Sequence, residues 1–229
     1  VSVLYCPFIQ LFKFHLVLRL LSMLRRSVKN FRPFGFIGLG QMGARMAPNI
    51  FKDTSITELV VFDVSAEAGE GVAQTVAATF PGKKVTLAVS PSEVAEKTNT
   101  IVTMLPNGKI VSDVYEKHLV PNAQAGTVFL DCSTIDPDTP KQLAAAMVSK
   151  GALFFDAPVS GGINAAAAGT LTFMVGSPRP VDFSTAEATL KYFGKSVVNC
   201  GATGSGQVCK LCNNLILGQH MVAVSEAML

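Results

Sequence analysis

Residues 34–43 read FGFIGLGQMG, a short apolar run followed by a glycine-rich turn. Three glycines in this stretch have the G-x-G-x-x-G spacing found where a β-strand turns tightly into a helix. The first glycine of such a turn permits the bend, the second lets a pyrophosphate approach the backbone, and the third allows the helix to pack on the strand. The stretch therefore predicts a dinucleotide site, with a plain structural turn as the alternative. The candidate cofactor-binding residues of the turn are Gly38, Leu39, Gly40, Gln41, Met42 and Gly43.

An acidic residue follows at the position where a dinucleotide site requires one. Asp63 lies 20 residues after Gly43, at the end of a predicted second strand. A carboxylate there accepts hydrogen bonds from the ribose hydroxyls and repels a 2′-phosphate. No arginine directly follows it, so the sequence favours NAD over NADP as the cofactor.

Predicted strands and helices alternate along the chain as in a parallel α/β sheet. Strands are predicted at residues 34–37, 59–64, 85–89, 100–105, 127–131, 153–156, 171–175 and 197–200. Helices are predicted at residues 43–52, from Ser65 to residue 80, after Ser90, from about residue 137, and near residues 181–192. From residue 207 onwards apolar residues recur at helical spacing without a proline, which predicts one long helix.

Two further strand ends are expected at the same edge of the sheet, where ligands of parallel sheets bind. Met104, Leu105 and Pro106 end the fourth predicted strand, so they are candidate cofactor contacts or an ordinary strand terminator. Ser133 and Thr134 follow the next strand. They add two hydroxyls to the candidate site, although Ser133 can equally be a helix N-cap.

A third motif, residues 156–162, reads DAPVSGG. Its backbone amides at Ser160, Gly161 and Gly162 can hold an anion such as a carboxylate, or can form a simple turn. It lacks the G-x-S-x-G nucleophile elbow, and the chain has three histidines, so a serine-hydrolase triad has little support.

Lys210 lies four residues before Asn214 on the last predicted helix, which places both side chains on one face. Its neighbours are mostly apolar, and loss of solvent lowers the pKa of a lysine from about 10.4 toward working pH. Lys210 is therefore a candidate proton acceptor, with a solvated helix lysine as the alternative.

Composition limits the classes of protein that fit. The chain has 229 residues, of which 49% are hydrophobic and 15% charged, as in globular proteins. Residues 34–229 carry a net charge of −3, so a nucleic-acid partner has no support there. The five cysteines are scattered and odd in number, which argues against a secreted disulfide framework. Cys209 and Cys212 form a C-x-x-C without the second pair of a structural zinc site, so no metal is predicted.

Residues 1–33 carry six basic residues and no acidic one, the bias of a mitochondrial transit peptide. An untranslated, mis-joined or interfacial segment is the alternative. No run reaches the roughly 20 apolar residues of a membrane span.

Four motifs, taken in order, resemble the β-hydroxyacid dehydrogenase family. They are GFIGLGQMG at residues 35–43, STIDP at 133–137, DAPVSGG at 156–162 and G-x-G-x-x-x-K-x-x-N-N at 204–214. The resemblance implies a Rossmann-type NAD-binding domain at residues 34–203. It also implies an interdomain helix from residue 204 to 229, leading into an all-helical domain used for dimerisation.

The resemblance also implies an activity, the NAD-dependent oxidation of 3-hydroxyisobutyrate to methylmalonate semialdehyde in mitochondrial valine breakdown. Lys210 would be the general acid/base, and Ser160, Gly161, Gly162 and Asn214 would hold the substrate. Related dehydrogenases and reductases act on tartronate or succinate semialdehyde or on glyoxylate, and these substrates remain open. Because the chain stops 19 residues after Lys210, an inactive NAD-binding module is a further expectation.

Overall fold

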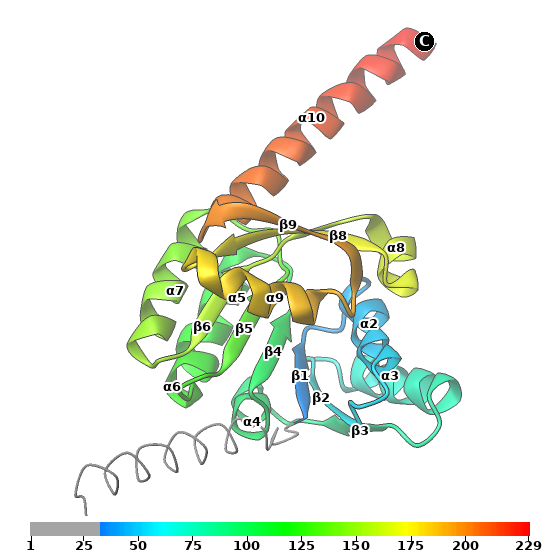
Figure 1. The fold of residues 1–229 in the computed structure, drawn as a ribbon. Helices are drawn as coiled ribbons and strands as arrows, with labels where there is room; N and C mark the ends of the chain where they lie inside the picture. The colour runs from blue at the N-terminus through cyan, green and yellow to red at the C-terminus, as the bar shows by residue number, and fades with distance from the viewer. Residues whose placement is uncertain (1–32) are drawn as a thin grey trace, which may run out of the picture. The chain divides into compact units, whose positions relative to one another are not determined.

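A nine-stranded sheet forms the centre of residues 33–229, the part of the chain that the computed structural model describes (Figure 1). The strands are β1 (Phe34–Ile37), β2 (Glu58–Phe62), β3 (Lys84–Leu87), β4 (Thr100–Thr103), β5 (Val128–Asp131), β6 (Leu153–Asp156), β7 (Val159–Ser160), β8 (Leu171–Ser177) and β9 (Gly194–Ala202). Their order is β3-β2-β1-β4-β5-β6-β8-β7, and β9 pairs with β8. The predicted transit peptide lies outside the described residues.

Strands β1 to β6 pair in parallel, which confirms the predicted α/β class. Strand β8 differs, because it is antiparallel to both β6 and β7. The chain continues past β6 through β7, is turned by the short helix α8 (Gly162–Ala168), and comes back as β8. A parallel return requires a longer crossover that carries the chain back to the starting edge. The last strands therefore add an antiparallel portion that the alternating pattern did not predict.

Helices cover both faces of the sheet (Figure 1). They are α2 (Gly43–Met46), the 3-10 helix η1 (Ala47–Lys52), α3 (Ala66–Thr79), α4 (Pro91–Lys97), α5 (Gly108–Val114), the π-helical turn η2 (Tyr115–Leu119), α6 (Val120–Asn122), α7 (Asp138–Ser149), α8, the 3-10 turn η3 (Pro180–Asp182), α9 (Phe183–Leu190) and α10 (Ser205–Met228). Buried side chains form one core on each face. One core includes Phe36, Phe155 and Phe173, and the other includes Tyr115 and Phe154.

Several predicted helix ends are confirmed in detail. The hydroxyl of Ser65 accepts a hydrogen bond from the Ala68 amide at the start of α3. Ser90 caps α4 in the same way. The helix predicted at residues 43–52 is α-helical only to Met46 and then 3-10, because Pro48 has no amide hydrogen to donate.

The segment α5–η2–α6 was missing from the predicted elements. Val111, Tyr115 and Leu119 are buried at a four-residue spacing, which is the periodicity of an amphipathic helix. Asn107 caps its first turn by accepting from the Ile110 amide. This segment borders the carboxyl ends of the parallel strands, so the omission affects the candidate site.

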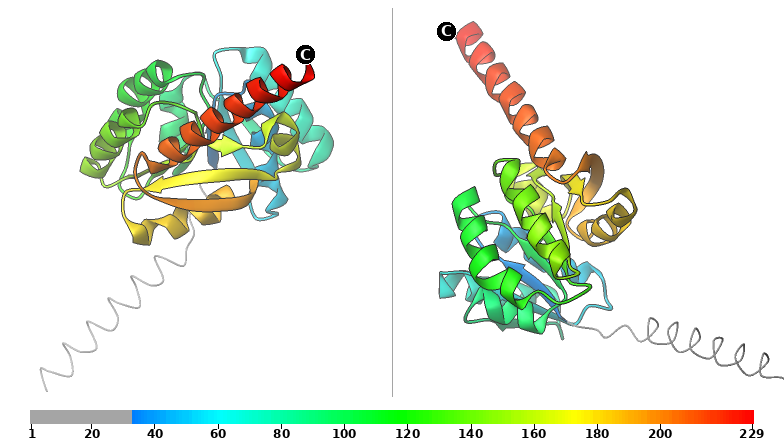
Figure 2. Two further views of the ribbon diagram at one scale, coloured as in Figure 1. Left: turned by 90° about the horizontal axis from the view of Figure 1, so that it is seen from above. Right: turned by 90° about the vertical axis from the view of Figure 1, so that its left-hand side faces the viewer.

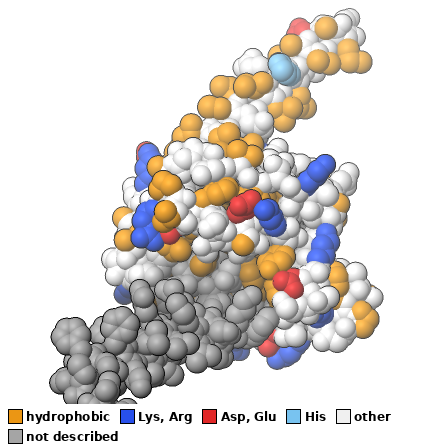
Figure 3. All heavy atoms as spheres, in the orientation of Figure 1, with side chains coloured by type: hydrophobic (Ala, Val, Ile, Leu, Met, Phe, Trp, Pro, Cys, Tyr) orange, Lys and Arg blue, Asp and Glu red, His pale blue; other side chains and the backbone are white. Residues whose placement is uncertain are grey.

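Helix α10 begins against the sheet and then extends away from it (Figures 1 and 2). Gly206 and Gln207 are buried, whereas every residue from Leu211 to Leu229 is exposed. Apolar side chains gather along this exposed part (Figure 3), among them Leu215, Ile216 and Met221. Within residues 33–229, no helix has the length and apolar character needed to cross a membrane.

Candidate functional site

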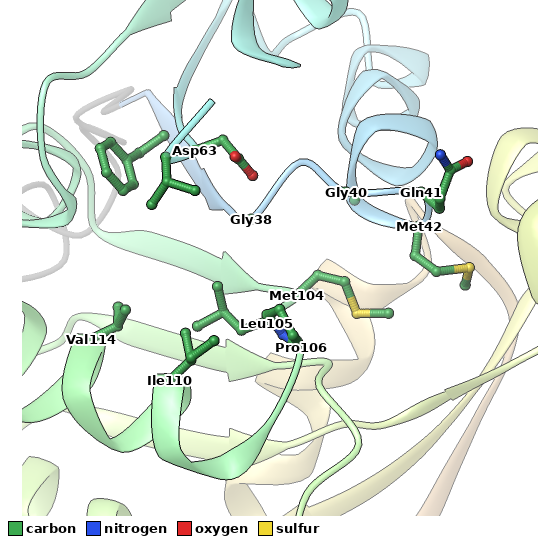
Figure 4. A pocket seen from close by; sticks show the side chains of 13 residues that line it. Gly38, Gly40, Gln41, Met42, Asp63, Met104, Leu105, Pro106, Ile110 and Val114 are labelled. Atoms are coloured by element: carbon green, nitrogen blue, oxygen red, sulfur yellow. The ribbon is translucent and has the colours of Figure 1, made fainter. Parts of the chain in front are cut away.

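A pocket of about 480 Å³ opens where the strand order reverses, at the carboxyl ends of β1 and β4 (Figure 4). Strand β1 has β2 on one side and β4 on the other, which is the position where doubly wound sheets bind ligands. Nine of the predicted cofactor residues line this pocket: Gly38, Gly40, Gln41, Met42, Gly43, Asp63, Met104, Leu105 and Pro106. The pocket therefore brings together three segments that are distant in sequence.

The three glycines of the turn differ in what a side chain would meet. Gly38 has a φ of +92°, and a Cβ on it would overlap the carbonyl of Met104. A Cβ on Gly43 would overlap the carbonyl of Gly38. Around Gly40, by contrast, no heavy atom lies within 4 Å of where a Cβ would stand. Gly38 and Gly43 are thus required by the fold, whereas Gly40 leaves open space at the pocket, which fits a pyrophosphate.

Asp63 joins the end of β2 to the glycine turn. Its Oδ2 accepts a 2.6 Å hydrogen bond from the Leu39 amide, and its Oδ1 accepts a 2.9 Å bond from the Ser65 amide. Leu39 itself is buried, so this residue supports the turn while its neighbours face the pocket. The carboxylate lies at the pocket wall, in the position expected for a ribose contact.

The structure gives Ser133 a supporting position beneath the pocket. This residue is buried. Its Oγ donates a hydrogen bond to Asp131 at 2.6 Å and accepts one from the Leu105 amide at 2.9 Å. It does not cap α7, whose N-terminal turn is instead satisfied by Asp136. Thr134 is exposed and lies outside the pocket lining. The N-cap alternative is therefore wrong, and Ser133 fixes the backbone of a lining residue.

Asp131 anchors this arrangement from inside the protein. The Thr103 hydroxyl donates to Asp131 at 2.8 Å and lies 3.0 Å from the Tyr115 hydroxyl, which is therefore the donor in that second bond. Burial raises the pKa of Asp131 to about 6, opposed by the hydrogen bonds from Ser133 and Thr103. Oδ2 of Asp131 is buried without a hydrogen-bond partner in the described structure.

A second buried acid holds the start of α10. Asp156, at the end of β6, accepts from the amides of Gly204 at 2.7 Å and Gln207 at 3.0 Å. Burial raises the pKa of Asp156, and the amide hydrogen bonds partly offset this. The side chain of Gln207 donates to the Ser133 carbonyl at 2.8 Å and accepts from the Ile135 amide at 3.0 Å. The first turn of α10 is thereby fixed over the carboxyl ends of β5 and β6.

Lys210 lies one turn further along α10 and is half-buried. Loss of solvent lowers the pKa of its ammonium group. Asn214, the residue predicted to share its helix face, is exposed. Neither residue lines the pocket.

The predicted anion-binding stretch also lies outside the pocket lining. Gly161 and Gly162 have φ values of +136° and +70° and are exposed, and Ser160 ends β7. Helix α8 starts at Gly162, so the stretch is a strand-to-helix turn. Nine of the twelve predicted cofactor residues thus gather at one pocket, whereas the predicted catalytic and substrate residues lie on other elements and do not line it.

Sequence inspection missed several residues of this site. Phe62, Val64, Ile110 and Val114 give the pocket an apolar portion. The first two directly flank Asp63, and the last two belong to the helix that was not predicted. The anchoring roles of Gln207 and Asp156 carried no local signal, because their partners lie 48 to 74 residues away in the sequence.

A family model described as the NAD binding domain of 6-phosphogluconate dehydrogenase matches residues 33–201. The chain belongs to this family. The match confirms NAD as the predicted type of cofactor, and it covers every strand of this NAD-binding domain up to the last residue but one of β9.

The chain is also similar to longer dehydrogenases. It is 44% identical over 204 residues to the probable mitochondrial 3-hydroxyisobutyrate dehydrogenase of Dictyostelium discoideum, covering 88% of this chain and 60% of that protein. It is 40% identical over 205 residues to the human mitochondrial 3-hydroxyisobutyrate dehydrogenase, covering 89% and 58%. The chain therefore spans about 60% of the length of the curated relatives it matches.

A solved structure of a 3-hydroxyisobutyrate dehydrogenase has a similar fold. The 3-hydroxyisobutyrate dehydrogenase of Mycobacterium tuberculosis, determined with L-serine, superposes with a TM-score of 0.76 at 34% identity, over 86% of this chain and 63% of that one. These relatives confirm the resemblance to β-hydroxyacid dehydrogenases.

Proposed function

We propose that this chain contributes the cofactor half of an NAD-dependent dehydrogenase that oxidises 3-hydroxyisobutyrate to methylmalonate semialdehyde, in mitochondrial valine breakdown. The observation that carries the proposal is the pocket at the β1–β4 switch point, with open space at Gly40 and a carboxylate at its wall. The identity of 40–44% to named 3-hydroxyisobutyrate dehydrogenases supports the choice of substrate, and the names of those relatives support a mitochondrial location.

The chain's residues have separate roles in this proposal. The backbone of the glycine turn binds the pyrophosphate, and Asp63 accepts from the ribose hydroxyls and disfavours the 2′-phosphate of NADP. Ser133 holds the Leu105 amide in place, so that Met104, Leu105 and Pro106 form the opposite wall. Residues 34–203 act as the NAD-binding domain, and residues 204–229 act as an interdomain helix in a homo-oligomeric enzyme.

Lys210 handles the proton in the proposed reaction. NAD held in the pocket would supply the hydride acceptor for the substrate carbon. The lowered pKa of Lys210 favours its neutral form, and this neutral amine takes the proton of the substrate hydroxyl. The amides of Ser160, Gly161 and Gly162 hold the substrate carboxylate, and Asn214 donates to the substrate from the next turn of α10.

The test is NADH formation from NAD and 3-hydroxyisobutyrate by the full chain, compared with its Lys210→Ala variant. Loss of a general base lowers turnover by about 10²–10⁴-fold, while the affinity for NAD stays unchanged. Lys150→Ala, at an exposed lysine at the end of α7, is the matched control and should retain activity. Turnover that survives Lys210→Ala would contradict the assigned role.

A second candidate function is an NAD-binding module without turnover. The observation that favours it is the exposure of every residue of α10 beyond Lys210, Asn214 included. This candidate predicts NAD binding with no NADH formation on any hydroxy acid of a panel that includes glycerate and 4-hydroxybutyrate, the reduced forms of tartronate semialdehyde and succinate semialdehyde. Turnover of a panel member other than 3-hydroxyisobutyrate would instead reassign the substrate within the same family.

A further inference from the structure

Two side chains of η1 hold the end of α8. Asn49 is 4% exposed, and its Nδ2 donates to the carbonyl of Ala166 at 2.9 Å and to that of Arg45 at 2.9 Å. Lys52 donates from Nζ to the carbonyl of Ala168 at 2.8 Å. These contacts join segments that are 116 and 117 residues apart in the sequence. Helix α8 consequently lies beside α2 and η1, as Figure 1 shows.

The two contacts from η1 lie at the carboxyl end of α8. The last carbonyl groups of a helix have no partner within it, and α8 has only seven residues, so it has little stability of its own. Lys52 gives the Ala168 carbonyl a partner, and Asn49 gives the Ala166 carbonyl a second one in addition to the Gly169 amide. Gly169 ends the helix at a φ of +69°, and a Cβ there would stand 3.0 Å from Oδ1 of Asn49 and overlap Nζ of Lys52. The close approach of η1 thus depends on glycine at this position.

Both helices joined by these contacts adjoin residues of the proposed site. Helix α2 starts at Gly43, at the end of the glycine turn, and η1 continues it without a break. Helix α8 starts at Gly162, the last residue of the stretch assigned above to the substrate carboxylate. Asn49 and Lys52 therefore link the element that follows the cofactor turn to the element that carries the substrate stretch.

We propose that Asn49 and Lys52 are positioning residues that fix α8, and with it the stretch from Ser160 to Gly162, against the helix of the cofactor turn. The role of that stretch in binding the substrate rests on the proposed function. The fixing of α8 rests only on the contacts described here.

The test uses the full chain and compares Lys52→Met with Lys52→Arg and with Lys83→Met. Lys83 is a matched control, because its Nζ also donates to backbone carbonyls, those of Thr54 at 2.7 Å and Ile56 at 2.6 Å, neither of which belongs to α8. In Lys52→Met, amide hydrogen exchange over residues 162–170 should become about fivefold faster, while Lys52→Arg should restore the slower rate. Lys83→Met should leave these amides unchanged.

Asn49→Asp is a second, nearly isosteric variant. It replaces a donor by a carboxylate that faces two carbonyl oxygens, so exchange over the same residues should become about tenfold faster or more. Unchanged exchange over residues 162–170 in both variants, or equal acceleration across the whole sheet, would overturn the proposal.

The substrate readout separates this proposal from the proposed function. With 3-hydroxyisobutyrate, Lys52→Met should raise KM about fivefold, with kcat and the Kd for NAD within about twofold of the parent. Faster exchange in a chain that turns over no hydroxy acid would support the fixing of α8 and contradict the proposed function. A rise in the Kd for NAD equal to the rise in KM would overturn a specific effect on the substrate stretch.

Discussion

The backbone amide of Leu39 donates a 2.6 Å hydrogen bond to the Asp63 carboxylate. This bond connects the glycine turn after β1 to the end of β2, two parts of the dinucleotide signature that the sequence separates by 24 residues. The same carboxylate also accepts from the Ser65 amide at the start of α3. Asp63 therefore fixes the shape of the turn, in addition to its proposed contact with the ribose.

Asp63→Asn should weaken NAD binding by about tenfold, because a neutral amide makes weaker hydrogen bonds than a carboxylate. The preference for NAD over NADP should also narrow, since the charge that repels a 2′-phosphate is lost. Calorimetric titration with each dinucleotide measures both effects. Glu67→Gln, at an exposed acid in the first turn of α3, is the control and should bind NAD as the parent does. Unaltered NAD affinity in Asp63→Asn would refute the assigned contact.

Asp131 should make stability depend on pH. Its pKa is raised from 3.8 to about 6 in the folded protein, so folding favours the protonated form. The stability that this group contributes is fully present below its unfolded pKa and is lost as the pH rises through about 6. A shift of about two units corresponds to about 3 kcal/mol.

Urea unfolding of the parent and of Asp131→Asn isolates this contribution. The difference between their free energies of unfolding should change by about 2 kcal/mol between about pH 4 and about pH 7, because the unfolded carboxyl is already partly ionised at pH 4. Asp156, whose pKa is also raised, titrates in both proteins, so most of its own contribution cancels; its charge is one of the causes that raise the pKa of Asp131. A difference that stays constant over this range would show that Asp131 is not the titrating group.

Gln207→Leu should destabilise the protein by about 3 kcal/mol, because the buried Ser133 carbonyl and Ile135 amide each lose a partner. The effect is measurable as a lower urea midpoint. Gln74→Leu on the exposed face of α3 changes the same residue type without removing such contacts, and it should cost much less. Equal effects of the two substitutions would mean that Gln207 does not anchor α10.

Local sequence patterns sufficed for most of the sheet and for the cofactor pocket. Apolar residues and the glycine spacing predict strand β1 and its turn. The caps at Ser65 and Ser90 are also predictable, because each depends on a hydrogen bond within one helical turn. The antiparallel direction of β8 could not be predicted from local patterns, because it depends on the length of the connection through α8. The helix at residues 108–122 did have a signal, in the spacing of Val111, Tyr115 and Leu119.

The supporting contacts of the site could not be predicted from local patterns. The sequence around Ser133 is typical of an N-cap or of a hydroxyl that faces a pocket. In the structure its side chain instead lies between the buried Asp131 carboxylate and the Leu105 amide. Gln207 is a polar residue in an apolar helix, and its partners belong to the loop after β5. Such roles emerge only when the strands assemble and bring their carboxyl ends to one edge.

The most direct test of the central claim is the Kd for NAD of Gly40→Ala. No heavy atom lies within 4 Å of the added Cβ, and Gly40 does not have a positive φ, so the melting temperature should stay at the parent value. If the pyrophosphate lies against this glycine, NAD affinity should fall by about tenfold or more. Gly71→Ala on α3, which also meets no atom within 4 Å, is the control and should bind NAD normally. NAD binding by Gly40→Ala with the parent affinity would contradict the placement of the cofactor in this pocket.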